Sequence, residues 1–405
     1  MIAGTPVLDL DDAASLQAAD TGGALRSAAS GGAQVRATAA AVDEDVLARL
    51  TGLRPRSVVL VCGSGRATRA AGLLIAALGE RASLPIVSAS MLPPWVGPLD
   101  VVLVAGDDAG DPRLIDSVDR AVRRGAEVVV AAPLEGPLRA AAAGRAASLE
   151  PRVPVLAYNR LLRFLAAGIA VLRAVDPIRT AEAVPDLTAL ADLLDAEALR
   201  DGPQSDVFHN PAKTLAARMH QRGIVLVGDS PAATVLAAHA AEVLVQSAGR
   251  VSTAAGLAEI VAALPRITET AGRATPDFDP LFHDEELDGP APVERIGVFV
   301  LSADPDTSAA RRRIAVFGSG SGLVDADLVG ADVDLLQTAL ADPSVPAAAK
   351  IDDPAAPRPS SGHGTELEQL AVLAVRLEMA AAYLRLLGSG TSASTGGDHF
   401  DGGRY

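Results

Sequence analysis

Two stretches of the chain share one pattern: a buried strand, a glycine turn and then a helix. Residues 57–66 read Ser-Val-Val-Leu-Val-Cys-Gly-Ser-Gly-Arg, and residues 223–231 read Gly-Ile-Val-Leu-Val-Gly-Asp-Ser-Pro, each followed by an alanine-rich segment. A tight turn between a strand and a helix directs unpaired backbone N–H groups at one point, which suits an anion. Because the pattern occurs twice, the sequence predicts two stacked α/β domains that share one architecture.

Short apolar runs alternate with helical segments in the first unit. Continuous Val and Leu without polar alternation indicates burial on both faces, and therefore a parallel sheet between two helical layers. The pattern predicts a five-stranded, three-layer α/β domain, with strands at residues 58–62, 84–89, 101–105, 127–131 and 153–157.

The second unit is less regular, and we expect the same kind of domain there. Its strand candidates are residues 224–227, 243–246, 297–301 and 314–317, and a long loop is expected over 265–292. Residues 366–387 carry apolar side chains at helical spacing, which predicts an amphipathic helix packed on a domain or on a partner chain. We therefore divide the chain into an N-terminal helical segment (1–54), a first domain (55–160), a helical bridge (161–205), a second domain (206–317), an insertion (318–365), a C-terminal helix (366–388) and a disordered tail (389–405).

Charge and composition exclude several classes of function. The 405-residue chain has a formal net charge of −15, which argues against binding to nucleic acid or to an anionic membrane surface. Its one cysteine, Cys62, excludes an internal disulfide and a cysteine-based zinc site. The sequence shows no secretory signal and no apolar stretch of about 18 residues, so we expect a cytoplasmic protein.

The layout resembles the sugar isomerase (SIS) fold and, within it, the bifunctional phosphoglucose/phosphomannose isomerase family. Four local matches between residues 57 and 387 carry the resemblance: Gly63-Ser64-Gly65, the segment 101–133, Asn210-Pro211-Ala212-Lys213 and Glu259-Ile260-Val261. The resemblance implies two three-layer SIS-type domains with parallel five-stranded sheets. It also implies a hexose phosphate bound between them. The amphipathic helix over 366–387 separately predicts a homodimer, and we expect no cofactor.

The chain departs from that family at the residues that perform catalysis. Gly106, Asp108 and Asp111 stand where the family has hydroxyl side chains that hold the phosphate. A carboxylate at about 4 Å from a phosphate costs on the order of 4 kcal/mol at an effective dielectric constant near 20. The positions of the catalytic glutamate and histidine fall near Ser247 and Leu257, and the late lysine has no counterpart. Neither side chain supplies a base, so the resemblance predicts the fold but not the mechanism.

Three turns are candidates for binding the anion. Gly63, Ser64, Gly65 and Arg66 form the first, where the serine hydroxyl and converging N–H groups donate and arginine supplies charge. Its alternative is a plain strand–helix turn that needs glycine. Gly106 with Asp108 marks the second turn. Gly228 with Ser230 marks the third, where Asp229 or Ser230 serves equally well as a helix N-cap.

The run Phe-His-Asp-Glu-Glu at 282–286 offers an acid or base. His283, with Glu259 or Glu285 as its partner, is the candidate catalytic group. The alternative is a solvated acidic loop, and the aspartates at 107, 108 and 111 leave open a divalent cation. The other histidines show no metal-ligand spacing, and we predict no metal site.

Two functions therefore remain open. The chain binds a hexose phosphate, and if it is active it is an aldose–ketose isomerase; alternatively it is a catalytically silent regulatory or assembly partner of a sugar-phosphate enzyme.

Overall fold

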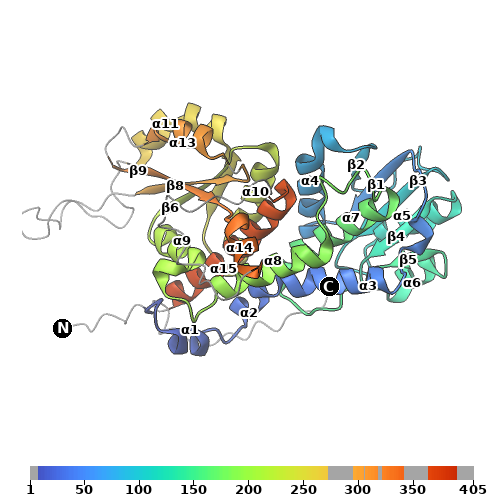
Figure 1. Ribbon diagram of the computed structural model, residues 1–405, viewed down its shortest axis with the longest axis horizontal. Coiled ribbons are helices and arrows are strands. Elements are labelled where there is room, and N and C mark those ends of the chain that lie inside the picture. The colour runs from blue at the N-terminus through green and yellow to red at the C-terminus, as the bar shows by residue number, and fades with distance from the viewer. Residues whose placement is uncertain (1–7, 272–294, 305, 318–321, 342–363, 390–405) are drawn as a thin grey trace, which may run out of the picture.

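Two parallel sheets lie on opposite sides of the molecule, with helices between and around them (Figure 1). The structure is a computed structural model and describes residues 8–271, 295–304, 306–317, 322–341 and 364–389. The predicted class, α/β with two three-layer domains, is confirmed.

The first sheet has five parallel strands in the order β2-β1-β3-β4-β5. Four of them lie where the sequence predicted: β1 (Ser57–Cys62), β2 (Ile86–Ala89), β3 (Asp100–Ala105) and β4 (Glu127–Ala131). The fifth prediction, 153–157, is wrong, because β5 is Ala146–Ser148. Pro154 lacks an N–H group and does not suit a strand interior, whereas the short Ala-Ala-Ser edge strand has no Val-rich signal.

Alternate residues of β1 and β3 enter two separate cores, which explains why the runs show no polar alternation. Val58 and Leu60 pack against α4 (Arg66–Leu78) and α7 (Leu161–Val175), whereas Val59 and Val61 pack against α5 (Pro112–Arg123) and α6 (Gly136–Ala142). A sheet buried on both faces needs apolar side chains at every position.

The second sheet has four parallel strands within the described residues, where the family resemblance implied five. The order is β7-β6-β8-β9, formed by β6 (Gly223–Gly228), β7 (Ser252–Gly256), β8 (Ile296–Ser302) and β9 (Val324–Gly330). The strand predictions for β6 and β8 are confirmed. Residues 324–341, expected in an insertion, form β9, which pairs with β8, and α14 (Val333–Ala341).

Two strand predictions in this domain are wrong. Residues 243–246 belong to α10 (Pro231–Ala248), and Ile314 ends α13 (Ser308–Ile314). Helix α10 begins with a Ser230 cap and Pro231 in its first turn and ends at Gly249 in the left-handed conformation. These end signals hold Val243 in a helix despite its β propensity. Helix α11 (Leu257–Ala271) covers the start of the expected 265–292 loop.

The C-terminal helix α15 (Glu366–Ser389) forms where predicted, but it is not amphipathic. Apart from Arg385, every residue from Leu367 to Leu387 is buried. Helix α15 packs against α2 (Ala24–Ala29), α8 (Leu187–Arg200), α9 (Pro211–Met219) and α10. These helices enclose α15 (Figure 1), so it offers no free apolar face to a partner.

The remaining helices complete the bridge between the two sheets. Helix α3 (Gly31–Asp43) packs on α7 and α8, and α4 packs directly on α10 (Figure 1). The other short helical elements are α1 (Ala13–Ala19), η1 (Ala48–Leu50), η2 (Gly79–Arg81), η3 (Ala157–Asn159) and η4 (Val207–His209). None of the helices in the described ranges has the length and apolar character needed to span a bilayer.

A buried charge cluster joins α8 to α15. Arg376 Nε donates to Glu197 Oε1 at 2.6 Å, and both side chains are at most 5% exposed. Burial alone would lower the pKa of Arg376, but the charges of Glu197, Asp201 and Asp332 raise it instead. Burial, and then the charge of Glu197, raises the pKa of Asp201 well above its ordinary value. The cluster therefore holds Arg376 charged in the interior.

Candidate functional site

Each sheet has one point where the strand order reverses. It lies between β1 and β3 in the first sheet and between β6 and β8 in the second. In open parallel sheets, ligands bind in the crevice outside the carboxyl ends of the strands at such a point. The loop at residues 63–65 and the loop at 106–111 border the first crevice, and the loop at 228–230 borders the second.

The 63–65 loop is open to solvent and held by hydrogen bonds at its base. Gly63 N donates to Ala105 O at 2.9 Å, and Thr68 Oγ1 donates to Gly63 O at 2.5 Å. Ser64 and Gly65 are exposed. Gly65 adopts φ 75° and ψ −131°, a conformation that only glycine reaches without strain. The loop therefore exposes Ser64 and Gly65 directly before the N-terminus of α4, the kind of position at which anions bind.

The 106–111 loop lies beside it and carries three carboxylates. Asp111 Oδ2 is 3.8 Å from the point where a Cβ on Gly63 would stand. Asp111 caps α5 and forms a 2.9 Å ion pair with Arg113, whose hydrogen bond holds the pKa of Asp111 below its ordinary value. Asp108 accepts a hydrogen bond from Gly110 N at 2.7 Å. The crevice thus contains an ionised carboxylate next to the proposed anion position.

Asp107 and Gly106 in this loop have structural roles. Asp107 pairs with Arg163 at 2.7 Å and with Arg160 at 3.0 Å, so two arginines balance its charge. A Cβ on Gly106 would lie 2.5 Å from Leu114 Cδ1, so glycine at this position lets α5 approach β3. Within the described residues, no group of three or more His, Cys, Asp or Glu side chains is arranged to hold a metal ion.

The side chain of Arg66 points away from the loop and into the domain interface. It is 4% exposed and donates to Glu242, and to Gln246 Oε1 at 2.9 Å, on α10. Arg69 donates to the same Glu242 at 2.9 Å. The Arg66 backbone stays at the start of α4, whereas its guanidinium anchors one domain to the other.

A histidine–carboxylate pair lies behind Arg66 in the interior. His239 Nε2 is 3.0 Å from Glu378 Oε1, and Glu378 Oε2 accepts a 2.7 Å hydrogen bond from Asn159. Burial lowers the pKa of His239, which Glu378 partly opposes. Both side chains are 1% exposed, so neither reaches a ligand. From the sequence, His239 was only one of several histidines without metal-ligand spacing, and Glu378 was not identified. The shared face of His239, Glu242 and Gln246 becomes apparent only once 243–246 is known to be helical.

The 228–230 loop is closed against its own helix. Ser230 Oγ accepts a hydrogen bond from Ala233 N at 3.1 Å, so it is the N-cap that the sequence offered as an alternative. A Cβ on Gly228 would overlap the backbone of Ala233 and Thr234. Burial, and also the charge of Asp304, raises the pKa of Asp229. A closed turn among carboxylates does not suit a phosphate.

The two glycine loops lie at opposite ends of the interface between α4 and α10. Arg66, at the start of α4, contacts the second half of α10. Arg81, just beyond the end of α4, pairs with Glu366 at 2.5 Å, and the charge of Asp229 near the start of α10 raises the pKa of Glu366 in addition to the effect of burial. Helices α4 and α10 are therefore antiparallel, and the structure does not bring Gly228 and Ser230 to the crevice at Ser64.

The candidate catalytic residues do not join this crevice either. Glu259 is exposed at the start of α11, where its Oε2 accepts a hydrogen bond from Gly256 N at 3.1 Å. His283 and Glu285 lie outside the described residues. Thus Gly63, Ser64, Gly65, Gly106 and Asp108 lie together, whereas Glu259 belongs to the carboxyl end of β7 in the other sheet.

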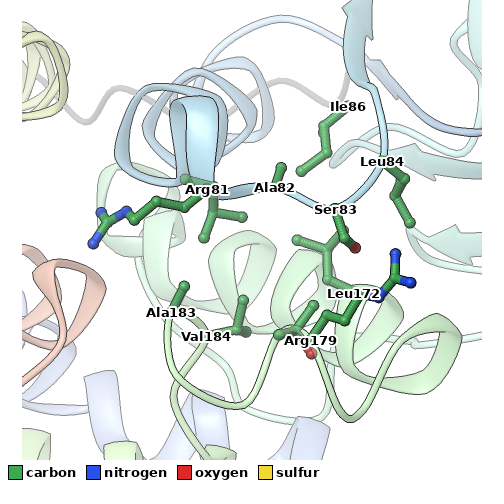
Figure 2. Close-up of a pocket in the computed structure, with 11 residues that line it drawn as sticks. Arg81, Ala82, Ser83, Leu84, Ile86, Leu172, Arg179, Ala183 and Val184 are labelled. Carbon is green, nitrogen blue, oxygen red and sulfur yellow. The ribbon is translucent and has the colours of Figure 1, made fainter.

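A shallow pocket occurs elsewhere, at the amino end of β2. Figure 2 shows aliphatic side chains, among them Ile86, Leu172 and Val184, between Arg81 and Arg179. Ile86 is the first residue of β2, so this pocket lies at the opposite edge of the sheet from the 63–65 loop. Arg81 is already paired with Glu366, and Ser83 Oγ donates to Asp176 at 2.6 Å. The pocket therefore lies beside the connection between α4 and β2, and it is separate from the crevice at the switch point.

Comparison with known proteins supports the fold assignment. No family model and no curated sequence matches the chain. Among solved structures, it is similar to tagatose-6-phosphate ketose/aldose isomerase from Escherichia coli (TM-score 0.51, 13% identity, covering 92% of each chain). It is also similar to the C-terminal domain of glucosamine-fructose-6-phosphate aminotransferase from Francisella tularensis (0.52, 8%, covering 90% of this chain and 95% of that one) and to a candidate phosphosugar isomerase from Bacillus subtilis (0.51, 15%, covering 89% and 95%). The chain thus has the SIS-type fold. This similarity shows the fold alone and does not confirm the narrower assignment to the bifunctional isomerase family.

Proposed function

We propose that the chain binds a hexose phosphate in the crevice between β1 and β3. The observation that carries this proposal is the open 63–65 loop, where the exposed Ser64 lies at a topological switch point, directly before the start of α4. Two of the structural neighbours are named for sugar 6-phosphates, which supports this ligand class. The protein acts in the cytoplasm as a homodimer.

The carboxylates of the 106–111 loop favour the sugar over the phosphate. The carboxylate oxygens of Asp108 and Asp111 accept hydrogen bonds, so they pair with sugar hydroxyls and repel a dianion. The phosphate then sits at Ser64, on the backbone N–H groups, and the hydroxyls lie toward Asp108. Free phosphate or sulfate should bind less well than a sugar phosphate.

The ligand is bound without isomerisation. Isomerisation needs a base at C1 or C2 of the sugar. His239 and Glu378 are buried, and Ser247 and Leu257 stand at the family's catalytic positions with 7% and 3% exposure. The alternative is an active isomerase that uses His283 with Glu285 or Glu259, and replacing His283 by alanine then abolishes turnover.

Thermal unfolding in the presence of sugar phosphates tests the proposal. A ligand at about a hundred times its dissociation constant stabilises the fold by about 2.7 kcal/mol, which raises Tm by several degrees. We expect glucose, fructose or mannose 6-phosphate to give this shift and sulfate to give less. Ser64→Ala should reduce it, and Ser230→Ala, at the matching loop of the second domain, should leave it unchanged. No shift with any sugar phosphate, or loss of the shift in Ser230→Ala alone, would contradict the proposal.

Neutralising Asp111 should strengthen phosphate binding. Asp111→Asn keeps an N-cap of equal quality on α5, removes a negative charge beside Gly63 and frees Arg113 from its ion pair. Solvent and Arg113 already screen part of the repulsion, so we expect the affinity for inorganic phosphate to rise about tenfold, or about 1.4 kcal/mol, by calorimetric titration. Asp192→Asn removes an exposed carboxylate on α8 and should leave the affinity as in the unmodified protein. An unchanged or weaker affinity of Asp111→Asn for phosphate would mean that the phosphate does not bind at the 63–65 loop.

A further inference from the structure

The homodimer of the proposed function needs a surface other than α15, because that helix is buried within one chain. The loop between β2 and β3, residues 90–99, offers one, and we call it the Trp95 loop. Its Met91, Trp95 and Leu99 are 47%, 46% and 66% exposed. Trp95 is the only tryptophan of a chain with 3% aromatic residues. Tryptophan is enriched among residues that dominate interface energies.

The Trp95 loop is anchored by buried side chains and hydrogen bonds, so binding to it should cost little ordering entropy. Leu92 and Val96 are buried in the core beneath it. Leu92 N donates to Ser117 Oγ at 3.1 Å, and Gly97 N donates to Asp100 Oδ2 at 2.9 Å. Arg124 Nη1 donates to the carbonyl oxygens of residues 93 and 94 at 3.1 and 2.9 Å.

Cations border the exposed apolar side chains. The Arg56 guanidinium lies 5.5 Å from the centre of the Trp95 ring. Its ion-pair partner Asp100 is fully buried, whereas the Arg56 side chain is 55% exposed. A partner therefore meets the guanidinium and not the carboxylate. The hydrogen bonds of Arg124 in this loop go to neutral carbonyl oxygens. In a protein with a net charge of −15, these two guanidinium groups beside exposed apolar side chains favour a negatively charged partner.

Charge then selects the occupant. Two identical Trp95 loops would bring like-charged arginines together, which disfavours their direct pairing. Residues 277–288 lie outside the described part of the chain and read Asp-Phe-Asp-Pro-Leu-Phe-His-Asp-Glu-Glu-Leu-Asp, with six carboxylates, two phenylalanines and no lysine or arginine. Such a segment supplies both the negative charge and the apolar side chains that the loop lacks.

We propose that residues 277–288 of one copy bind the Trp95 loop of a second copy. A twofold axis makes the contact twice, once in each direction. The proposal extends the homodimer of the proposed function and is independent of the sugar ligand, so either can fail alone.

Sedimentation velocity of the full chain tests it. We expect a dimer that dissociates on dilution and at high salt. Trp95→Ala should weaken dimerisation at least tenfold, and so should joint replacement of Asp284, Glu285 and Glu286 by their amides, which leaves the loop intact. Phe208→Ala removes another exposed aromatic side chain, 92% exposed, and should have no effect.

Tryptophan fluorescence gives a second readout, because Trp95 is the only source of the signal. A synthetic peptide of residues 276–289 should shift the emission to shorter wavelength and dissociate the dimer, and its amide-substituted form should do neither. A monomer at all concentrations, a Trp95→Ala protein that dimerises normally, or a peptide without effect would overturn the proposal.

Discussion

Replacing Gly228 by alanine should destabilise the protein by about 3 kcal/mol or more, at the top of the range for overpacked sites. The new Cβ would overlap backbone atoms of Ala233 and Thr234 in the first turn of α10. Backbone atoms cannot rotate away as a side chain can, so β6 and α10 would have to separate. Urea unfolding followed by circular dichroism gives the change in the free energy of unfolding.

Gly63→Ala is the control, since Gly63 lies in the strand–helix turn of the first domain, directly after β1. The nearest atom to a Cβ there is Ala105 O at 3.7 Å, an ordinary contact. We expect a change within about 1 kcal/mol. Equal losses of unfolding free energy in the two variants would show that the second loop is not closed more tightly than the first. Gly228 and Ser230 would then again be candidates for a ligand site.

Removing Glu197 should cost about 3 kcal/mol, because it leaves Arg376 charged in the interior without its closest partner. Losses for broken buried pairs reach about 5 kcal/mol. We expect the lower part of that range, since the pKa of Asp201 falls once Glu197 is gone and its carboxylate then partly compensates. Glu197→Ala in the same urea experiment measures the effect.

Asp192→Ala on the same helix provides the comparison. Asp192 pairs with Arg36 at 2.9 Å, but the two side chains are 48% and 44% exposed. Exposed pairs contribute little, so we expect a change of at most about 0.5 kcal/mol. A Glu197→Ala protein as stable as Asp192→Ala would mean that water reaches Arg376, and that the α8–α15 contact is not held by its charges.

The sequence predicted the central strands well but missed the edge strands β5 and β7. β1, β3 and β4 are buried on both faces, so their Val-rich runs carry a strong local signal. β5 and β7 are edge strands made of Ala, Ser, Thr and Gly, and pairing with a neighbour, not their composition, makes them strands. The Val-rich segment 243–246 shows the converse, because strong end signals place it in a helix.

The candidate site was predicted only in part. Parallel strands end at one edge of their sheet, so the sequence was sufficient to bring Ser64 and Asp108 together. It assigned Arg66 to the same anion, whereas the guanidinium turns toward Glu242, 176 positions later in the chain. It also combined two glycine loops that lie at opposite ends of the α4–α10 interface.

The sequence alone determined what depends on neighbouring residues: the repeated strand–turn–helix units, the caps of α5 and α10, and the glycine turn that opens at Ser64. Only the tertiary structure decided where charged side chains point, that α15 is buried on all sides, and that the second glycine loop is closed. The physical reason is that burial and ion pairing depend on which distant segments pack together, and similar local patterns, such as the two glycine loops, have different neighbours.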